Sequence, residues 1–406
     1  MKSLTLLLPL ILTFPLASAQ PSNGLAPEVT DLNAEDVSYQ LEWKLPYLEK
    51  PFFTTRPQDR KDGLPVGELG KDGGDVDKVL EFARSLSKES RNPKVGKTDS
   101  LLVAYKGKLL FESYFRRGRI NYPHYQMSIT KSYTALAIGR AIQLGHLKME
   151  DLQRPAVSFL KDLEPAKLVK GADKITLHEA MHMCSGIRLP AVKVALLRKR
   201  PELLKGQGQI QAYLEHSAPI PPAPRDFKYQ GADTAITMQV LEAVVPGSAK
   251  DFIRDELLGA LGITNYHWQA DLSGLPKAAA GSSVRSRDML KLGMLVMANG
   301  KWKGQQLIPA EFIKAATSPL RKTHGNSSYG YYWWVEPFEV GGKTYHSIQG
   351  RGAGGQFLFI FPELELVAVI TSHNRGMGNM LRTVPQKVIP GFVKVSHRHP
   401  IKQSPR

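Results

Sequence analysis

The sequence predicts an α/β (α+β) fold, in which a mixed, mainly antiparallel sheet is formed by N- and C-terminal strands and a helical region is inserted between them. Residues 101–105 and 109–115 are apolar runs on either side of a Gly-containing turn, the pattern of a β-hairpin. Residues 356–361 and 366–371 form a second such pair. The long region between the hairpins has helical spacing of apolar residues with many Gly and Pro breaks. Strands at both ends and helices between them indicate one sheet built by both ends of the chain.

The composition is that of a globular protein with a substantial buried core. The 406 residues are 42% hydrophobic and 22% charged, with one Cys, which excludes a disordered chain, a collagen-like rod and a disulfide scaffold. A formal charge of +17 predicts a surface that attracts anions. The basic stretches at 198–200 and 397–406 lack interleaved aromatic residues. We therefore expect no nucleic-acid binding and only a weak contact with an anionic envelope surface.

Residues 1–19 have the pattern of a secretory signal peptide. Lys2 precedes an apolar run at 4–16, and Ala-Ser-Ala at 17–19 forms a small-residue cleavage site. Two prolines interrupt the run, which is shorter than the ~20 residues of a membrane-spanning helix. We expect a periplasmic or secreted protein, a setting that a single free Cys permits.

The remaining chain divides into three predicted parts. Residues 20–97 are rich in Pro, Gly, Asp and Lys and contain one amphipathic stretch, at 79–86, so they form a leader segment with a docked helix. Residues 98–385 hold both hairpins and the helical region and form the main domain. Residues 386–406 form a basic C-terminal tail.

Ser128 and Lys131 are the first candidates for catalysis. They lie at the start of a predicted helix, and their three-residue spacing puts both side chains on one face. A serine hydroxyl is a weak nucleophile until a neighbouring base takes its proton. A lysine is such a base only when burial and nearby positive charge, such as a helix N-terminus, lower its pKa toward neutrality. The spacing alone is weak, since it is common on solvated helix faces.

Four segments in a fixed order along the chain are more specific than the spacing of Ser128 and Lys131 alone. They are residues 127–147 around Ser-Ile-Thr-Lys, 175–187 with a Ser-Gly turn, 288–309, and the Gly-rich strand 350–356. Together, over roughly residues 100–370, they resemble the serine β-lactamase and penicillin-binding-protein-like hydrolases, in particular the class C β-lactamase and esterase branch. The resemblance implies a β-lactamase-like catalytic domain over 98–385.

The resemblance also implies a role for individual residues. Ser128 would be the acylated nucleophile and Lys131 the base that receives its proton. Tyr229 stands where the family has a tyrosine that carries a proton to the leaving group, and its ordinary pKa near ~10 makes this role depend on Lys131 beside it. The oxyanion would be held by the Ser128 N–H and by one N–H of the Gly-rich strand. The candidates on that strand are Gly352, Ala353, Gly354 and Gly355.

Two departures from the family pattern bear on the substrate. The β-lactamases have Tyr-x-Asn, but here the third residue is Gly231, so the amide that would hold a β-lactam side chain is missing. They also have Lys-Thr-Gly on the active-site strand, whereas Lys343-Thr344 is followed by Tyr345 and lies too early. Arg351 and His346 are the alternative anchors for a substrate carboxylate. The departures favour an esterase or amide hydrolase over an efficient β-lactamase.

A competing motif is His178-Glu179-x-x-His182, which on a helix would present two imidazoles to one zinc ion with Glu179 as base. The extended form of the motif is absent, and Glu202 is a conceivable third ligand.

The sequence thus predicts an exported serine hydrolase that cleaves a small-molecule ester, amide or peptide through an acyl-enzyme, with no metal or organic cofactor. The alternatives are a zinc metallopeptidase and a catalytically weak penicillin- or peptide-binding module on the same fold.

Overall fold

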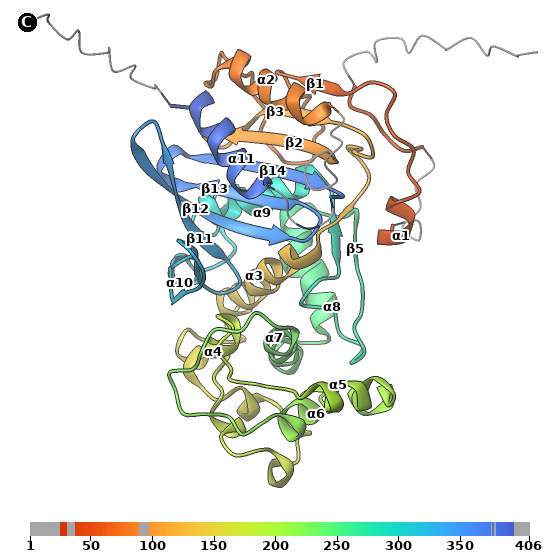
Figure 1. The fold of residues 1–406 in the computed structure, drawn as a ribbon, viewed down its shortest axis with the longest axis vertical. Helices are drawn as coiled ribbons and strands as arrows, with labels where there is room; N and C mark the ends of the chain where they lie inside the picture. The colour runs from red at the N-terminus through yellow and green to blue at the C-terminus, as the bar shows by residue number, and fades with distance from the viewer. Residues whose placement is uncertain (1–24, 31–36, 89–96, 375, 377–378, 394–406) are drawn as a thin grey trace, which may run out of the picture.

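The computed structural model describes residues 25–30, 37–88, 97–374, 376 and 379–393, and shows a large sheet packed against a helical region (Figure 1). The expected signal peptide and most of the expected basic tail lie outside the described residues. Within them, no helix is both long and apolar enough to span a membrane.

The main sheet joins the two predicted hairpins. Among the described residues it has nine antiparallel strands, in the order β1-β3-β2-β14-β13-β12-β11-β10-β9. In the order of the chain the strands are Phe52–Thr54 (β1), Thr98–Tyr105 (β2), Lys108–Tyr114 (β3), Arg321–Lys322 (β9), Ser328–Tyr329 (β10), Trp334–Val340 (β11), Lys343–Gly352 (β12), Gln356–Phe361 (β13) and Leu366–Ser372 (β14). Because β2 pairs with β14, the N- and C-terminal hairpins form adjacent parts of one sheet, as the sequence predicts.

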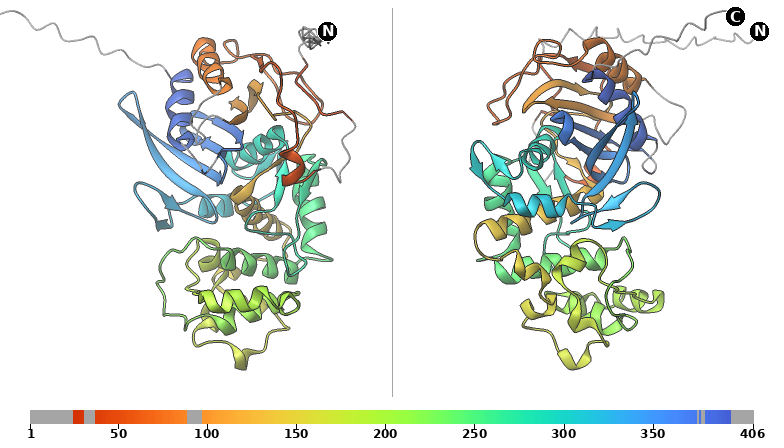
Figure 2. Two further views of the ribbon diagram at one scale, coloured as in Figure 1. Left: turned by 45° about the vertical axis from the view of Figure 1, so that its right-hand side comes forward. Right: turned by 90° about the vertical axis from the view of Figure 1, so that its left-hand side faces the viewer.

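Helices cover both faces of this sheet (Figure 2). On one face, Phe357, Phe359 and Phe361 of β13 share a buried apolar cluster with α2 (Val76–Ser87) and α11 (Met380–Val388). On the other face, Leu358 and Ile360 share a second cluster with α3 (Thr130–Gln143) and α9 (Ser286–Met297). Side chains alternate between the two faces of a strand, and both faces of β13 are buried. This explains why its sequence is a continuous apolar run.

The remaining described elements are helices and short strands, of which those between residues 177 and 244 lie in a helical region below the sheet, shown in yellow to green in Figure 1. The helices are Tyr39–Glu42 (α1), Leu177–Met181 (α4), Ala191–Arg198 (α5), Gly208–His216 (α6), Gly231–Val244 (α7), Ala249–Phe252 (α8), which continues into a π-helical segment, and Ala310–Ala316 (α10). The short strands are His124–Tyr125 (β4), Tyr266–Trp268 (β5) and Ser282–Val284 (β6), which form one small sheet, and the pair Lys301–Trp302 (β7) and Gln305–Gln306 (β8). A 3₁₀ turn, Met127–Ile129 (η2), precedes α3.

The leader segment is integrated into the fold. Strand β1 pairs with β3 at the edge of the main sheet, and α2 buries Val79, Phe82, Ala83 and Leu86. At the other end, α11 and the turn after it continue to Gly391, with Val388 and Ile389 buried, so packed structure extends past residue 385.

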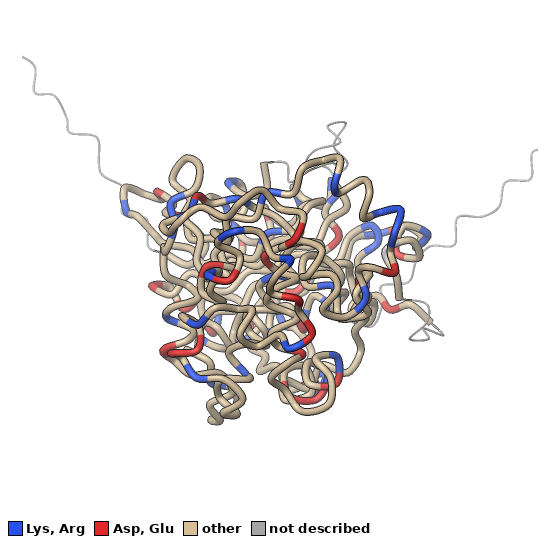
Figure 3. The backbone as a smooth tube through the Cα atoms, turned by 90° about the horizontal axis from the view of Figure 1, so that it is seen from below, with Lys and Arg blue, Asp and Glu red and all other residues tan. Residues whose placement is uncertain are grey.

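The excess of positive charge is spread along the chain. Seen from the helical side, Lys and Arg are distributed over many segments and interspersed with Asp and Glu (Figure 3).

Candidate active site

The turn that carries Ser128 has an uncommon backbone conformation. Met127 has φ of +49°, in the left-handed region where a residue other than glycine is strained. Thr130 fixes the turn, because its Oγ1 donates to Met127 O (2.7 Å). The same oxygen accepts from the N–H groups of Gly281 (3.1 Å) and Ser282 (3.2 Å). The hydroxyl of Thr130 therefore ties the start of α3 to strand β6 and positions Ser128.

Lys131 lies directly beside the Ser128 hydroxyl, as its spacing predicts. Its Nζ donates to Ser128 Oγ (3.1 Å) and to Ala279 O (2.6 Å), and the residue is only 4% exposed. Burial and, to a smaller extent, the positive charge of Lys277 together lower the pKa of Lys131 from 10.5 to about 7. Near neutral pH a large fraction of this lysine is uncharged and able to accept the serine proton.

Tyr229 completes the cluster from the other side. Its ring centroid lies 4.6 Å from Lys131 Nζ and 5.8 Å from the ring of Trp334. The side chain is 41% exposed, but its hydroxyl is directed inward to a hydrogen bond with Ser128. Burial of this hydroxyl raises the pKa of Tyr229, and the hydrogen bond to Ser128 and the charge of Arg351 oppose the increase.

A buried carboxyl group supports the loop that carries Tyr229. Asp233, on the first turn of α7, is fully buried and accepts hydrogen bonds from Ser185 Oγ (2.6 Å) and Gln230 Nε2 (2.7 Å). Burial raises its pKa to about 6. Through these bonds the predicted Ser-Gly turn holds the residue that follows Tyr229. Asp233 was not predicted, although an acidic residue in the first turn of a mainly apolar helix is a sign of such a buried partner.

Glycines allow strand β12 to lie against the nucleophile turn. A Cβ at Gly350 would approach Ile129 Cγ2 to 3.0 Å, and one at Gly352 would collide with the carbonyl oxygen of Gln126. A side chain at either position would push the strand away from η2. The Gly-rich strand is thus next to Ser128, where the sequence predicts an oxyanion site.

The N–H groups of that strand are not equally available. Gly354 N–H donates to Gly376 O (3.1 Å), and Gly355 N–H donates to Gly352 O (3.3 Å). Gly352 is itself paired with Gln356 in the sheet, so Ala353 is the stronger candidate for a second oxyanion donor.

The two proposed carboxylate anchors are both already paired. Arg351 is buried, forms an ion pair with Glu336 and donates from Nε to Gln349 Oε1 (2.6 Å). His346 is exposed and its Nδ1 lies 3.0 Å from Glu363 Oε1. Neither side chain is free to bind a substrate carboxylate in this arrangement.

The His-Glu-x-x-His segment forms α4, but its Glu is used elsewhere. His178 Nδ1 lies 2.6 Å from the hydroxyl of Tyr331, and His182 Nδ1 lies 2.6 Å from the carbonyl oxygen of His178. Glu179 closes a capping box at the N-terminus of its own helix and forms an ion pair with Arg225 (2.5 Å). Burial lowers the pKa of His182 to about 4. These contacts give each residue a structural role.

Glu202 does not join these histidines. Its carboxylate is exposed and pairs with Arg200 (3.0 Å). Among the residues that the structure describes, no third His, Cys, Asp or Glu brings a ligand atom within 4.8 Å of both imidazoles. The arrangement does not fit the three-ligand zinc site that the motif requires.

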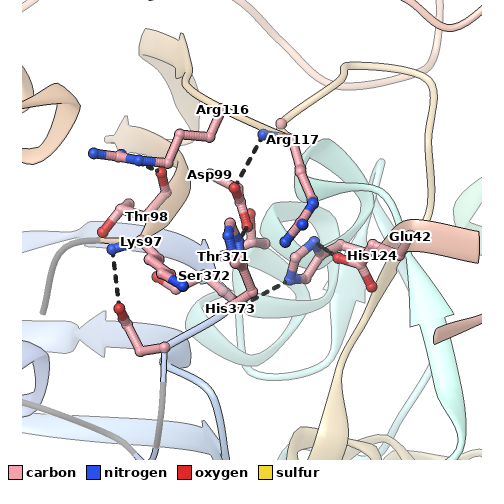
Figure 4. A network of polar contacts seen from close by, with 12 residues as sticks. Glu42, Lys97, Thr98, Asp99, Arg116, Arg117, His124, Thr371, Ser372 and His373 are labelled. Atoms are coloured by element: carbon pink, nitrogen blue, oxygen red, sulfur yellow. Dashed lines mark hydrogen bonds and ion pairs between the residues drawn. The ribbon is translucent and has the colours of Figure 1, made fainter. Parts of the chain in front are cut away.

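A second polar cluster, not predicted from the sequence, includes His124 of β4, the strand that precedes the nucleophile turn (Figure 4). Glu42 of the leader forms an ion pair with His124 Nδ1 and accepts from Tyr125 N–H (3.1 Å). His373 Nδ1 lies 2.7 Å from Asp99 Oδ2. Burial disfavours the charge of His124, but the Glu42 carboxylate outweighs it and raises the pKa of this histidine.

The ligand atoms of Glu42, Asp99 and His124 lie within 4.8 Å of one another, close enough to suggest a metal site. However, both nitrogens of each ring have protein partners: His124 Nε2 lies 3.2 Å from Ser372 O, and His373 Nε2 lies 3.0 Å from the Tyr47 hydroxyl. The cluster is thus satisfied as ion pairs and hydrogen bonds. It fastens the leader to the strand that leads into Ser128.

Comparison with known proteins agrees with this geometry. A family model described as Beta-lactamase matches residues 95–384. No curated protein matches the chain.

Solved structures share the fold at low sequence identity. A class C β-lactamase is 17% identical, with a TM-score of 0.61 over 78% of this chain and 96% of that one. A Bacillus anthracis protein, provisionally assigned as a 6-aminohexanoate-dimer hydrolase, is 19% identical, with a TM-score of 0.61 over 89% and 96%. A D-stereospecific amidohydrolase from Streptomyces sp. is 15% identical, with a TM-score of 0.57 over 75% and 97%. At these identities the likeness shows the fold alone.

Proposed function

Since this chain belongs to the β-lactamase family, which has the serine β-lactamase and penicillin-binding-protein fold, we propose that it is an exported serine hydrolase that cleaves ester or amide bonds through an acyl-enzyme on Ser128. The observation that carries the proposal is the pairing of Ser128 Oγ with a lysine amine 3.1 Å away whose pKa is about 7. A neutral amine at this distance is a competent general base for a serine.

The proposed reaction begins when Lys131 accepts the proton of Ser128 and the oxygen attacks the substrate carbonyl. The N–H groups of Ser128 and Ala353 hold the oxyanion, and each such donor typically contributes ~3–4 kcal/mol to transition-state stabilisation. Tyr229, a neutral phenol at pH 7 because its pKa is raised, gives its proton to the leaving group and recovers one from Lys131. Water then hydrolyses the acyl-enzyme by the same groups in reverse roles.

The surroundings of the site favour esters or linear amides over β-lactams. Gly231 replaces the Asn of the β-lactamase motif. Arg351 stands on the active-site strand but is neutralised by Glu336. A substrate that needs no carboxylate anchor therefore suits the site best.

The location of the protein is part of the proposal. The signal-peptide pattern at residues 1–19 supports a periplasmic or secreted enzyme. The charge of +17 supports a weak contact with anionic envelope material. We propose a small-molecule ester, amide or peptide substrate and no metal or organic cofactor.

A fluorophosphonate probe tests the proposal directly. The wild-type protein should be labelled covalently at Ser128, with or without a chelator, and Ser128→Ala should not be labelled and should not hydrolyse p-nitrophenyl acetate. A Ser113→Ala variant is the matched control, because it removes a buried serine hydroxyl that donates to Leu101 O and has no part in the proposed chemistry. Hydrolysis that a chelator abolishes, without a labelled serine, would instead support a zinc metallopeptidase. Ligand binding without turnover would support a catalytically weak binding module.

A further inference from the structure

A large cavity lies beside the catalytic cluster in the helical region. Its volume is about 740 Å³, within the usual range of small-molecule sites. Its walls come from the segment around α5, from α6 and α7, and from the loop at residues 270–279.

One end of the cavity reaches the proposed catalytic residues. Ala279 lines it and accepts the hydrogen bond from Lys131 Nζ (2.6 Å). Gln230, which directly follows Tyr229, also lines it. An acyl group attached to Ser128 would therefore find this cavity open beside it.

The walls are mainly apolar. Leu197, Leu204, Ala232, Ala235 and Ala278 are buried residues that line the cavity. Removal of each methylene group from water is favourable, so such walls favour an extended apolar chain.

The charged residues around the cavity are mostly basic. Arg198, Lys228 and Lys277 line it, and among the described residues none of the three forms an ion pair with a carboxylate. Asp271 is the acidic residue of the lining, and it already accepts hydrogen bonds from Ser273 Oγ (2.6 Å) and from Gln209. A positively charged chain would thus meet like charges without a free carboxylate to bind.

The outer edge of the cavity is also apolar. Leu272, which lines the cavity, is 48% exposed, so an apolar side chain stands where the cavity meets solvent.

We propose that this cavity binds the acyl part of the substrate, and that this part is an extended apolar chain without positive charge. The inference rests on the proposed function, since it assigns the cavity to the group that Ser128 would acylate.

Three p-nitrophenyl esters test the inference: the acetate, the octanoate and the 8-aminooctanoate. We expect kcat/KM for the octanoate to exceed that for the acetate by about 100-fold, part of the gain that six buried methylenes allow. The 8-aminooctanoate should lose most of this advantage, because its ammonium faces Arg198, Lys228 and Lys277.

Variants locate the effect in the cavity. Leu272→Glu should lower the octanoate-to-acetate ratio by about 10-fold and raise the relative rate of the 8-aminooctanoate. Leu320→Glu is the matched control, because Leu320 is 39% exposed and does not line the cavity, and it should keep the wild-type ratio. Since Leu272 is exposed, the change does not threaten folding. Ala235→Phe, which fills the cavity from α7, should lower the same ratio.

The outcomes separate the two proposals. Ser128-dependent hydrolysis of the acetate with equal kcat/KM for all three esters, or equal ratios in Leu272→Glu and Leu320→Glu, would overturn the cavity assignment and leave the serine mechanism standing. Absence of both fluorophosphonate labelling and ester hydrolysis would overturn the proposed function, and the cavity assignment with it.

Discussion

Replacing Lys131 by Met should stabilise the protein at low pH, and this gain should decrease as the pH rises. Burial lowers the pKa of Lys131 in the fold to about 7, whereas in the unfolded chain the ordinary value of 10.5 applies. Below pH 7 the lysine is protonated in both states, and the folded state bears the full cost of the buried charge. Between pH 7 and 10.5 only the unfolded state keeps the proton, so the stability of the wild-type protein rises with pH. Above pH 10.5 the cost has vanished.

The magnitude follows from the two pKa values. One pKa unit corresponds to ~1.4 kcal/mol, so the cost of the charged lysine is about 5 kcal/mol below pH 7. Solvent screening reduces this free-energy cost only slightly, because Lys131 is 4% exposed. The difference in unfolding free energy between variant and wild type should shrink by about 3 kcal/mol from pH 6 to pH 9. Loss of the hydrogen bond to Ala279 O costs ~1–3 kcal/mol at every pH and leaves the slope unchanged.

Urea unfolding at pH 6, 7, 8 and 9 measures this difference. Lys161→Met is the control, because Lys161 is exposed, and it should follow the wild-type protein at each pH. If Lys131→Met also runs parallel to the wild-type protein across this range, the lysine is not held neutral by burial, and its role as a base at pH 7 is refuted.

Three further predictions concern activity and stability. The kcat/KM for p-nitrophenyl acetate should rise with pH with a midpoint near 7, as Lys131 loses its proton, and a profile flat from pH 5 to 9 would contradict this. Gly352→Ala should lower kcat severely and destabilise the fold by ~1–3 kcal/mol in thermal unfolding, because its Cβ collides with Gln126 O; wild-type kcat would show that the strand is free to shift. Glu42→Gln should destabilise by ~3 kcal/mol at pH 6, measured in urea, and by less at pH 9. The raised pKa of His124 gives stability that is present below pH 6.5 and lost as the pH rises through the folded-state value, so an equal loss at both pH values would contradict the charged pair.

The parts of the fold that local pattern governs were predictable. Both hairpins follow from apolar runs around short turns, and the three-residue spacing of Ser128 and Lys131 does bring their side chains to 3.1 Å. The amphipathic stretch at 79–86 lies within α2. In each case the deciding interactions join residues close in the chain, so the sequence pattern carries the signal.

The supports of the site depend on contacts between distant segments. Thr130 is held by Gly281 and Ser282, about 150 positions away, and Glu42 pairs with His124. No periodicity marks such pairs, because each is a single polar contact created by tertiary packing. The His-Glu-x-x-His motif fails for the same reason, since the choice between a metal and Arg225 as the partner of Glu179 is made by tertiary structure.

The ion pair between Glu42 and His124 also determines where the chain can be cut when the domain is truncated or fused to another protein. The family match begins at residue 95, yet a carboxylate from position 42 holds the strand that precedes the nucleophile. A version trimmed to the matched region would contain every proposed catalytic side chain and still leave a buried imidazole without its counter-charge. Chimeras and truncations of this protein should therefore keep the segment that carries α1 and β1 together with the domain it completes.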